Sequence, residues 1–152
     1  MKYSVIQISR HQKYIELASK WFSNKWGVPA EAYIQSMEQS KNNSCISDWY
    51  IIHNEQGEII AGAGVIENDF HNRKDLTPNL CALYVDREYR KIGLAKKLLD
   101  FISKDYAYKG FEKLYLITDH TTFYEKFDWE YYTDVITDEN EKMRVYLKHT
   151  KL

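Results

Sequence analysis

The sequence predicts an α/β protein built on a central mixed, twisted sheet of about six to seven strands, flanked by about four helices. Segments with strand-like and helix-like apolar spacing alternate along the 152 residues. The middle of the chain is expected to form a strand, a helix and a second strand, and such a unit makes its two strands parallel. Because no linker, repeat or low-complexity tract interrupts the pattern, we expect one domain over residues 1–152.

The N-terminal half predicts a strand, two helices and a β-hairpin. The expected elements are a strand at 3–8, a helix around 15–22, a helix from Pro29 to about Ser40, and strands at 49–52 and 59–66. The two helices are separated by Gly27-Val28-Pro29, since Gly and Pro break helical spacing. The second hairpin strand carries only small residues at 61–64, which predicts that another group packs closely against it.

The C-terminal half predicts the parallel unit and a second hairpin. The expected elements are a strand at 80–85, a helix from about Leu94 to Tyr108, a strand at 113–118, a short helix at 121–127, and strands at 129–136 and 142–148. Gly110 is placed to end the long helix. The strand at 113–118 is apolar almost throughout, which favours an interior position in the sheet.

Composition excludes several classes of protein. The net charge of −1 argues against a general nucleic-acid binder. The two cysteines, Cys45 and Cys81, have no metal-ligand spacing and are expected to be free thiols, so no metal site is predicted. No apolar stretch approaches the length of a membrane span, and the first residues lack the apolar segment of a signal peptide. We therefore expect a cytoplasmic protein that binds neither membrane nor nucleic acid.

The most informative segment lies between the strand at 80–85 and the long helix. Its six residues are Arg90, Lys91, Ile92, Gly93, Leu94 and Ala95. A loop that turns from a strand into a helix N-terminus directs unpaired backbone N–H groups at one point, and the helix dipole adds partial positive charge there. Gly93 and Ala95 leave room for a bulky anion, so the segment predicts a phosphate-binding loop.

Two familiar phosphate motifs are absent, since the chain contains neither Gly-x-x-x-x-Gly-Lys-Ser/Thr nor Gly-x-Gly-x-x-Gly. The string Arg-x-x-Gly-x-Ala at 90–95 instead resembles motif A of the GNAT N-acetyltransferase superfamily, and the order of expected elements resembles the GNAT fold over essentially the whole chain. The resemblance implies that this loop binds the pyrophosphate of acetyl-coenzyme A (acetyl-CoA), with the parallel strand-helix-strand unit as the coenzyme A-binding unit.

A second motif supports the resemblance. The segment 123–129 resembles the C-terminal signature of the superfamily, in which a Tyr on a short helix precedes Gly-Phe or Gly-Trp. Asp128 stands where Gly is usual, and Asp tolerates turn conformations. The resemblance implies that Tyr124 protonates the departing thiolate of coenzyme A, and a phenol with a pKa of about 10 can do so at neutral pH. Alternatively, Tyr124 is a packing residue.

The strand before the loop is expected to act through its backbone. The resemblance implies that Leu83 and Val85 offer backbone groups to the pantetheine arm of the cofactor, and that the strand carries a bulge. The alternative is an ordinary buried strand. Cys81 lies on the same strand, but no histidine pairing is evident, so we expect it to pack rather than to act as a nucleophile.

The general base is left open by the sequence. An alkylammonium group must lose a proton before it attacks the thioester. Some members of the superfamily use a Glu near the start of the strand that precedes the phosphate loop, but the matching position here is Asn79. The remaining candidates are Glu67, Asp69, His71, Asp119, His120 and a water molecule. Asp119 could instead cap the short helix, where Thr122 and Glu125 have the spacing of a capping box, and Asp69 and His71 could serve only to order their loop.

The loop at 67–79 is the most individual part of the chain. It mixes charges of both signs with one aromatic of a type that is usually buried, Phe70, and resembles the corresponding stretch of a group of small bacterial members of the superfamily. Long loops in compact domains are more often functional than idle, so we expect it to form a wall of the acceptor site. The acidic turn around Asp138 could attract a cationic amine, but an ordinary solvated hairpin explains it as well.

Together with these residues, the resemblance implies an acetyl-CoA-dependent N-acetyltransferase, and we expect it to act on a primary amine of a small molecule by direct attack in a ternary complex. Two alternatives stay open: acetylation of a protein lysine or N-terminus, and a non-catalytic acyl-CoA sensor on the same fold, for which the absent carboxylate at Asn79 leaves room. The sequence leaves the acceptor and the oligomeric state undecided, with a homodimer as one option.

Overall fold

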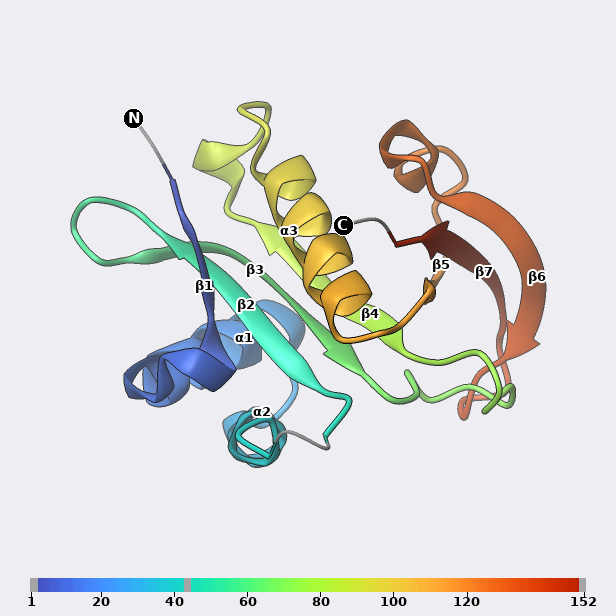
Figure 1. Cartoon of the computed structure of the whole chain (residues 1–152), viewed down its shortest axis with the longest axis horizontal. Helices are drawn as coiled ribbons and strands as arrows, with labels where there is room; N and C mark the ends of the chain where they lie inside the picture. The colour runs from blue at the N-terminus through green and yellow to red at the C-terminus, as the bar shows by residue number, and fades with distance from the viewer. Residues whose placement is uncertain (1–2, 43–44, 151–152) are drawn as a thin grey trace. The chain divides into compact units, whose positions relative to one another are not determined.

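The computed structural model describes residues 3–42 and 45–150, in which seven strands form one mixed sheet (Figure 1). The strand order is β1-β2-β3-β4-β5-β7-β6. The strands are β1 Val5–Gln7, β2 Asp48–His53, β3 Ile59–Ile66, β4 Asn79–Val85, β5 Lys113–Thr118, β6 Glu130–Ile136 and β7 Lys142–His149. The predicted parallel pair is confirmed, since β4 runs parallel to β5 with Asn79 opposite Tyr115. The predicted interior position of β5 is also confirmed, because it lies between β4 and β7.

Three α-helices lie within the described part of the chain: α1 Ile15–Trp26, α2 Ala30–Gln39 and α3 Leu94–Tyr108. They agree with three of the four expected helices. The short 3₁₀ helices are η1 Ile8–Arg10, η2 Gln12–Tyr14, η3 Arg87–Tyr89 and η4 Tyr124–Phe127. The fold is thus the predicted mixed α/β sheet.

The fourth expected helix, at 121–127, is wrong in extent and in type. Only the 3₁₀ helix η4 forms there, and no side chain caps its start at Phe123. The expected capping box is absent because Glu125 has another partner: its Oε2 accepts a hydrogen bond from the Tyr146 hydroxyl at 3.0 Å. The same hydroxyl also lies 2.9 Å from the carbonyl oxygen of Thr121. A contact from β7 therefore overrides the local capping pattern.

The contacts within the chain divide it into two compact units, residues 1–65 with 82–98 and residues 66–81 with 99–152. In the first unit, α1 packs on the small residues of β3. A methyl group added to Gly62 would lie 2.7 Å from the Phe22 ring, and one added to Gly64 would lie 2.3 Å from the Trp49 ring. The prediction that another group packs closely on residues 61–64 is confirmed, and the groups are these aromatic rings.

The first unit also has an aromatic core. The Phe22 ring packs against Tyr33 and Trp49 at centroid distances of 5.5 and 5.0 Å. The indole N–H of Trp49 donates to the Ser36 hydroxyl of α2 at 2.8 Å. These contacts join both helices to the hairpin of β2 and β3, and Figure 1 shows the two helices side by side.

In the second unit, β5, β7 and β6 pair antiparallel in that order. A core of Leu76, Val135 and Val145 lies among them, with Ile117 and Met143 packed against it. Leu76 belongs to the long loop before β4, so this loop is anchored in the core rather than free at the surface.

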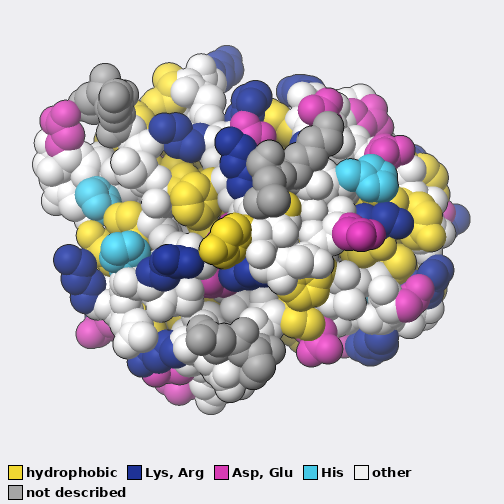
Figure 2. Space-filling view, viewed as in Figure 1, with side chains coloured by type: hydrophobic (Ala, Val, Ile, Leu, Met, Phe, Trp, Pro, Cys, Tyr) yellow, Lys and Arg dark blue, Asp and Glu magenta, His cyan; other side chains and the backbone are white. Residues whose placement is uncertain are grey.

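On the face seen in Figure 2, basic and acidic side chains are interspersed.

The close packing at Gly64 gives a test of the fold. We expect Gly64→Ala to lower the free energy of unfolding by about 1–3 kcal/mol, because the added methyl group would overlap the Trp49 ring. Urea unfolding measures this. In a double-mutant cycle, Trp49→Phe should offset part of the loss by making room for the methyl group. Equal losses from Gly64→Ala in both backgrounds would contradict the packing.

Candidate functional site

The predicted phosphate loop is exposed and rich in unpaired backbone donors. Among the described residues, none accepts a hydrogen bond from the backbone N–H groups of residues 91–95. Lys91 and Gly93 have left-handed backbones, with φ of 69° and 88°. Alternation of hand along a short segment turns successive N–H groups toward one side and forms a concave anion site. The segment therefore fits a phosphate group.

The motif residue Arg90 fixes the loop to β4. Its Nε donates to the carbonyl oxygen of Val85 at 2.8 Å. Its guanidinium lies over the Tyr84 ring at 5.3 Å, and Lys25 lies over the same ring at 5.2 Å. Lys25 also pairs with Asp86 at 2.9 Å. Arg90 thus helps to hold the loop against β4, and its predicted contact with the cofactor stays a prediction.

The strand β4 is irregular where the resemblance implied a bulge. Ala82 has a φ of 55°, which is rare for a residue with a side chain and interrupts the regular pleat. Its carbonyl oxygen accepts a hydrogen bond from the Trp26 indole at 3.2 Å, which helps to hold this backbone. Leu83 follows and is half-buried, and Val85 is buried. The strand is therefore irregular at Ala82, and the bulge that the resemblance implies stays a prediction.

Tyr124, the predicted proton donor, is half-buried at the start of η4. Its ring packs against Phe123 and Trp129 at 4.9 and 6.1 Å. Within residues 3–42 and 45–150, nothing forms a hydrogen bond with its hydroxyl, which keeps this group available for a ligand. Burial and the nearby Cys81 raise the pKa of Tyr124 to about 12, so the phenol stays protonated across the neutral range.

Asp128 confirms the role expected at the position of the usual glycine. It has a left-handed backbone with φ 67° and ψ 24°, and it ends η4. The backbone N–H of Trp129 returns to the carbonyl oxygen of Tyr124 at 3.2 Å. Aspartate is among the few residues other than glycine that visit this conformation. The turn after Tyr124 is therefore kept without glycine.

Cys81 is half-buried on β4, and burial together with the charge of Asp69 raises the pKa of its thiol well above the usual value. A raised pKa disfavours the thiolate, which is the nucleophilic form. This supports the expectation that Cys81 does not act as a nucleophile. Asp69 and Tyr124 each interact electrostatically with Cys81 within the second unit.

Asn79 and His71 form a fully buried pair inside the long loop. The backbone N–H of Arg73 donates to His71 Nδ1 at 3.1 Å, which assigns the proton of the ring to Nε2. That Nε2 donates to Asn79 Oδ1 at 2.7 Å. The amide group of Asn79 donates to the carbonyl oxygens of Leu76 and Glu67 at 2.6 and 3.3 Å. Both ring nitrogens of His71 are thus occupied, which argues for an ordering role rather than for a base.

This arrangement explains why a carboxylate does not stand at position 79. An ionised carboxylate only accepts hydrogen bonds, whereas this position must both accept from His71 and donate to two carbonyl groups. An amide does both. The departure from the family pattern at Asn79 is therefore a structural requirement of this loop.

A hollow of about 340 Å³ opens beside the loop in the second unit. It is lined by Asp69, Phe70, Ile117, Thr137, Asp138, Glu139, Glu141 and Met143. The loop joins the acidic turn through backbone contacts, because Asp138 N–H donates to the Phe70 carbonyl oxygen at 2.9 Å and Asn72 N–H donates to that of Ile136 at 3.0 Å. The sequence named the loop and the turn separately, and the structure brings them together.

Phe70 and the acidic turn both line this hollow. Phe70 is of a residue type that is usually buried, but 65% of its surface is exposed, and its φ of 61° is an outlier for an aromatic residue. The turn residues Asp138, Glu139 and Glu141 are exposed, as in a solvated hairpin, and they also line the hollow, so attraction of a cationic amine stays a prediction. The contact between the loop and the turn does not follow from local sequence, because Phe70 and Asp138 are almost 70 residues apart.

The other candidate bases have less suitable surroundings. Asp119 and His120 are exposed after β5, and the His120 ring packs near Phe123 at 6.0 Å. Glu67 is also exposed. It contacts Thr77 and Asn79 through its backbone carbonyl oxygen rather than through its carboxylate. Asp69 is half-buried at the hollow, and burial raises the pKa of its carboxyl. The structure therefore separates Asp69 from the rest.

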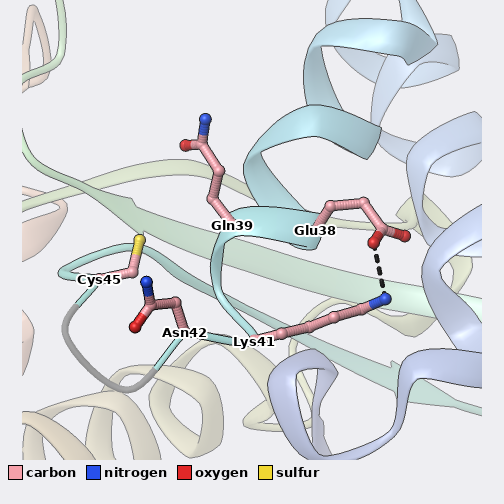
Figure 3. A pocket seen from close by; sticks show the side chains of 5 residues that line it. All are labelled: Glu38, Gln39, Lys41, Asn42 and Cys45. Carbon is pink, nitrogen blue, oxygen red and sulfur yellow. Dashed lines mark ion pairs between the residues drawn. The ribbon is translucent and has the colours of Figure 1, made fainter.

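A second hollow of about 490 Å³ lies at the end of α2 in the first unit. Figure 3 shows its lining side chains, with Lys41 paired to Glu38 at 2.6 Å and with Cys45 and Asn42 beside them. None of the predicted site residues lies here. In the part of the chain that the structure describes, no cluster of three or more potential metal ligands occurs. Likewise, none of the described helices has the length and hydropathy needed to cross a bilayer.

Comparison with known proteins defines the class. A family model described as an acetyltransferase (GNAT) domain matches residues 46–131. No curated protein matches. The fold is similar to that of a GNAT-family acetyltransferase of Staphylococcus aureus Mu50, with a TM-score of 0.70 and 18% identity over 99% of this chain and 100% of the other. An aminoglycoside 6′-N-acetyltransferase complexed with coenzyme A has a TM-score of 0.70 and 16% identity over 98% and 97% of the two chains.

The family match covers more than half of the chain, and it includes the irregular strand β4, the predicted phosphate loop and Tyr124. The chain belongs to the GNAT acetyltransferase family. The similarity to the two solved structures independently supports the same fold.

The amide at position 79 can be tested by a single-atom change. We expect Asn79→Asp to lower the free energy of unfolding by about 3 kcal/mol at neutral pH, because the carboxylate loses both donors while buried. Protonation restores one donor, so the loss should shrink as pH falls toward about 5 and grow as pH rises. Urea unfolding at several pH values measures this.

Asn72→Asp is the matched control. Asn72 is exposed, and its Oδ1 only accepts a hydrogen bond, from Ile136 N–H at 3.0 Å. A carboxylate keeps that function, so the control should change stability by less than about 1 kcal/mol. Equal losses in the two variants would contradict the assignment of the Asn79 amide as a required donor.

Proposed function

We propose that the protein is an acetyl-CoA-dependent N-acetyltransferase that acts on a primary amine of a small molecule, in the cytoplasm and without a covalent enzyme intermediate. Membership of the acetyltransferase family supports the general reaction. The observation that carries the proposal for this chain is the loop at 91–95, with five backbone N–H groups that lack a partner among the described residues. This arrangement fits the diphosphate of coenzyme A, which the aminoglycoside acetyltransferase of similar fold binds.

In this proposal each group has one task. The bound thioester supplies the acetyl group. Residues 91–95 hold the diphosphate, Leu83 and Val85 align the pantetheine arm through their backbone, and Tyr124 protonates the departing thiolate. The free hydroxyl of Tyr124 and the raised pKa, about 12, support its role, since the proton is present throughout the working range.

The loop can be tested through its glycine. Gly93→Ala should weaken acetyl-CoA binding about tenfold or more, because the residue at φ 88° would relax and turn the N–H groups away. Isothermal titration calorimetry gives the affinity. The control is Gly57→Ala in the turn between β2 and β3, with φ 81° and equally open surroundings.

Both variants should lose about 1 kcal/mol of stability from the strained backbone. Only the loop variant should lose affinity. Unchanged binding in Gly93→Ala, or no binding of acetyl-CoA by the wild-type protein at millimolar concentration, would contradict the proposed cofactor site.

Tyr124 can be tested by removal of one oxygen. Tyr124→Phe should lower kcat about 100-fold or more while the affinity for acetyl-CoA stays unchanged, because a general acid acts only in the transition state. Thiol release in the presence of amine measures turnover. Because the pKa of the phenol is about 12, the wild-type rate should show no loss from Tyr124 ionisation below that pH. Tyr108→Phe, at an exposed tyrosine of α3, is the control.

The same assay separates the alternatives. Thiol release with small amines supports the proposed acceptor, and release only with peptides would indicate acetylation of a protein lysine or N-terminus. Tight binding of acetyl-CoA without turnover for any amine would indicate a sensor. A tyrosine variant with the wild-type rate across pH would show that Tyr124 only packs.

A further inference from the structure

The hollow beside the long loop combines three kinds of chemistry in one unit of the chain. Ile117 and Met143 give it an aliphatic floor, and Phe70 adds an exposed aromatic face. The long loop contributes Asp69, and the turn contributes three carboxylates: Asp138, Glu139 and Glu141. Aliphatic, aromatic and anionic groups together match an alkylammonium ion, which an acidic surface alone would not select.

Backbone contacts join the two segments that form the hollow, the long loop and the acidic turn. The Phe70 carbonyl oxygen accepts from Asp138 N–H, and His71 forms a β-bridge with Thr137. The backbone N–H of Asp69 lies 3.4 Å from Asn79 Oδ1, so the buried amide also fixes the residue that carries the carboxylate. The left-handed backbone of Phe70 is a strained conformation that these contacts hold in place.

Asp69 differs from the other carboxylates of the hollow. It is half-buried, whereas the three acidic residues of the turn are exposed. It also interacts electrostatically with Cys81, which in turn interacts with Tyr124. Asp69 is therefore the carboxylate of the hollow that is both partly withdrawn from solvent and linked electrostatically, through Cys81, to the predicted proton donor.

On the basis of the proposed acetyl transfer, we propose that Asp69 is the general base and that the hollow binds an aliphatic amine with a second cationic group. The reacting ammonium lies against Asp69, and the second cation pairs with the turn carboxylates. The aliphatic segment between the two cations covers Ile117 and Met143.

The proton balance is complete with groups already named. The ammonium gives one proton to Asp69, and the free amine forms a C–N bond to the acetyl carbon. The C–S bond breaks, and the thiolate takes the proton of Tyr124. The second proton leaving the nitrogen passes through solvent to the tyrosinate, and Asp69 releases its proton to solvent. The products are an N-alkylacetamide, a thiol and one proton.

The charged surroundings of Asp69 support this role. His71 on its own loop lowers the pKa of the carboxyl, and burial raises it by more, so the net shift is upward. Cys81 on β4 is a neutral thiol, and the turn adds the negative charges of Asp138, Glu139 and Glu141. A carboxylate whose pKa is raised is a better base at neutral pH. Rate should fall as pH falls through this raised pKa.

Asp69→Asn is the direct test of the base. With putrescine as acceptor, kcat should fall about 100-fold or more and the acidic limb of the pH profile should disappear, while calorimetry gives an unchanged affinity for acetyl-CoA. Asp69→Glu should restore part of the rate. Glu112→Gln, at an exposed position before β5, is the control. A wild-type rate and pH profile in Asp69→Asn would overturn the assignment.

The second cation is tested with three amines of equal chain length. Putrescine should exceed butylamine in kcat/KM by about tenfold, and γ-aminobutyrate should be the poorest, because its carboxylate meets the acidic turn. The triple variant Asp138→Asn, Glu139→Gln, Glu141→Gln should abolish this order and bring kcat/KM for putrescine down to about the value for butylamine. An unchanged preference for putrescine in the triple variant would overturn the proposed amine class.

The two proposals fail in different ways. Thiol release that depends on an amine but not on Asp69 or the turn carboxylates would overturn only this inference. Failure of the wild-type protein to bind acetyl-CoA, or to release thiol with any of the three amines, would overturn the proposed function and this inference with it.

Discussion

The hydrogen bonds of the Asn79 side chain are the constraint on which the second unit depends. One buried amide accepts from His71 and donates to Leu76 and Glu67. It therefore joins the first residue of β4 to both ends of the long loop. Leu76 brings the loop into the core with Val135 and Val145. Without this amide, Nε2 of the buried His71 and the carbonyl oxygen of Leu76 would lose these partners, and each would carry a desolvation cost.

The same constraint bears on chemistry. Position 79 cannot carry an ionised carboxylate while it donates to two carbonyls, so a base must come from elsewhere. Asp69 is ten residues earlier, and the Asn79 side chain lies 3.4 Å from its backbone N–H. The loop thus places a carboxylate that its own anchor could not provide. Asn79 departs from the family motif, and Asp69 is a candidate for the general base that position 79 lacks. A replacement for the base favours an enzyme over a non-catalytic sensor.

Much of the fold could be predicted from local sequence, because its signals are local. Glycines at 27 and 110 end the helices as expected, with left-handed backbones at φ 72° and 97°. The succession of a strand, a loop with Gly93 and a helix was also predictable, and the phosphate site assigned to this loop stays a prediction. Tyr124 and Asp128 could be found only through resemblance to a family. Nothing in the spacing of Asp128 distinguishes it from the other aspartates. Its left-handed backbone fits the role of the usual glycine once the turn after Tyr124 is known.

The features that sequence could not supply arise from contacts between distant segments. Glu125 has the spacing of a capping residue, but its carboxylate binds Tyr146 of β7, and a residue 21 positions away decides its role. Phe70 is of a hydrophobic type that usually lies in the core, but the hydrogen bond from Asp138 N–H to its carbonyl oxygen holds its backbone at the hollow. Hydrophobicity predicts burial only when the backbone is free to turn the side chain inward. Where an anchored loop fixes the backbone, an exposed aromatic ring beside carboxylates is a stable outcome, and such a surface has the chemistry of the proposed alkylammonium site.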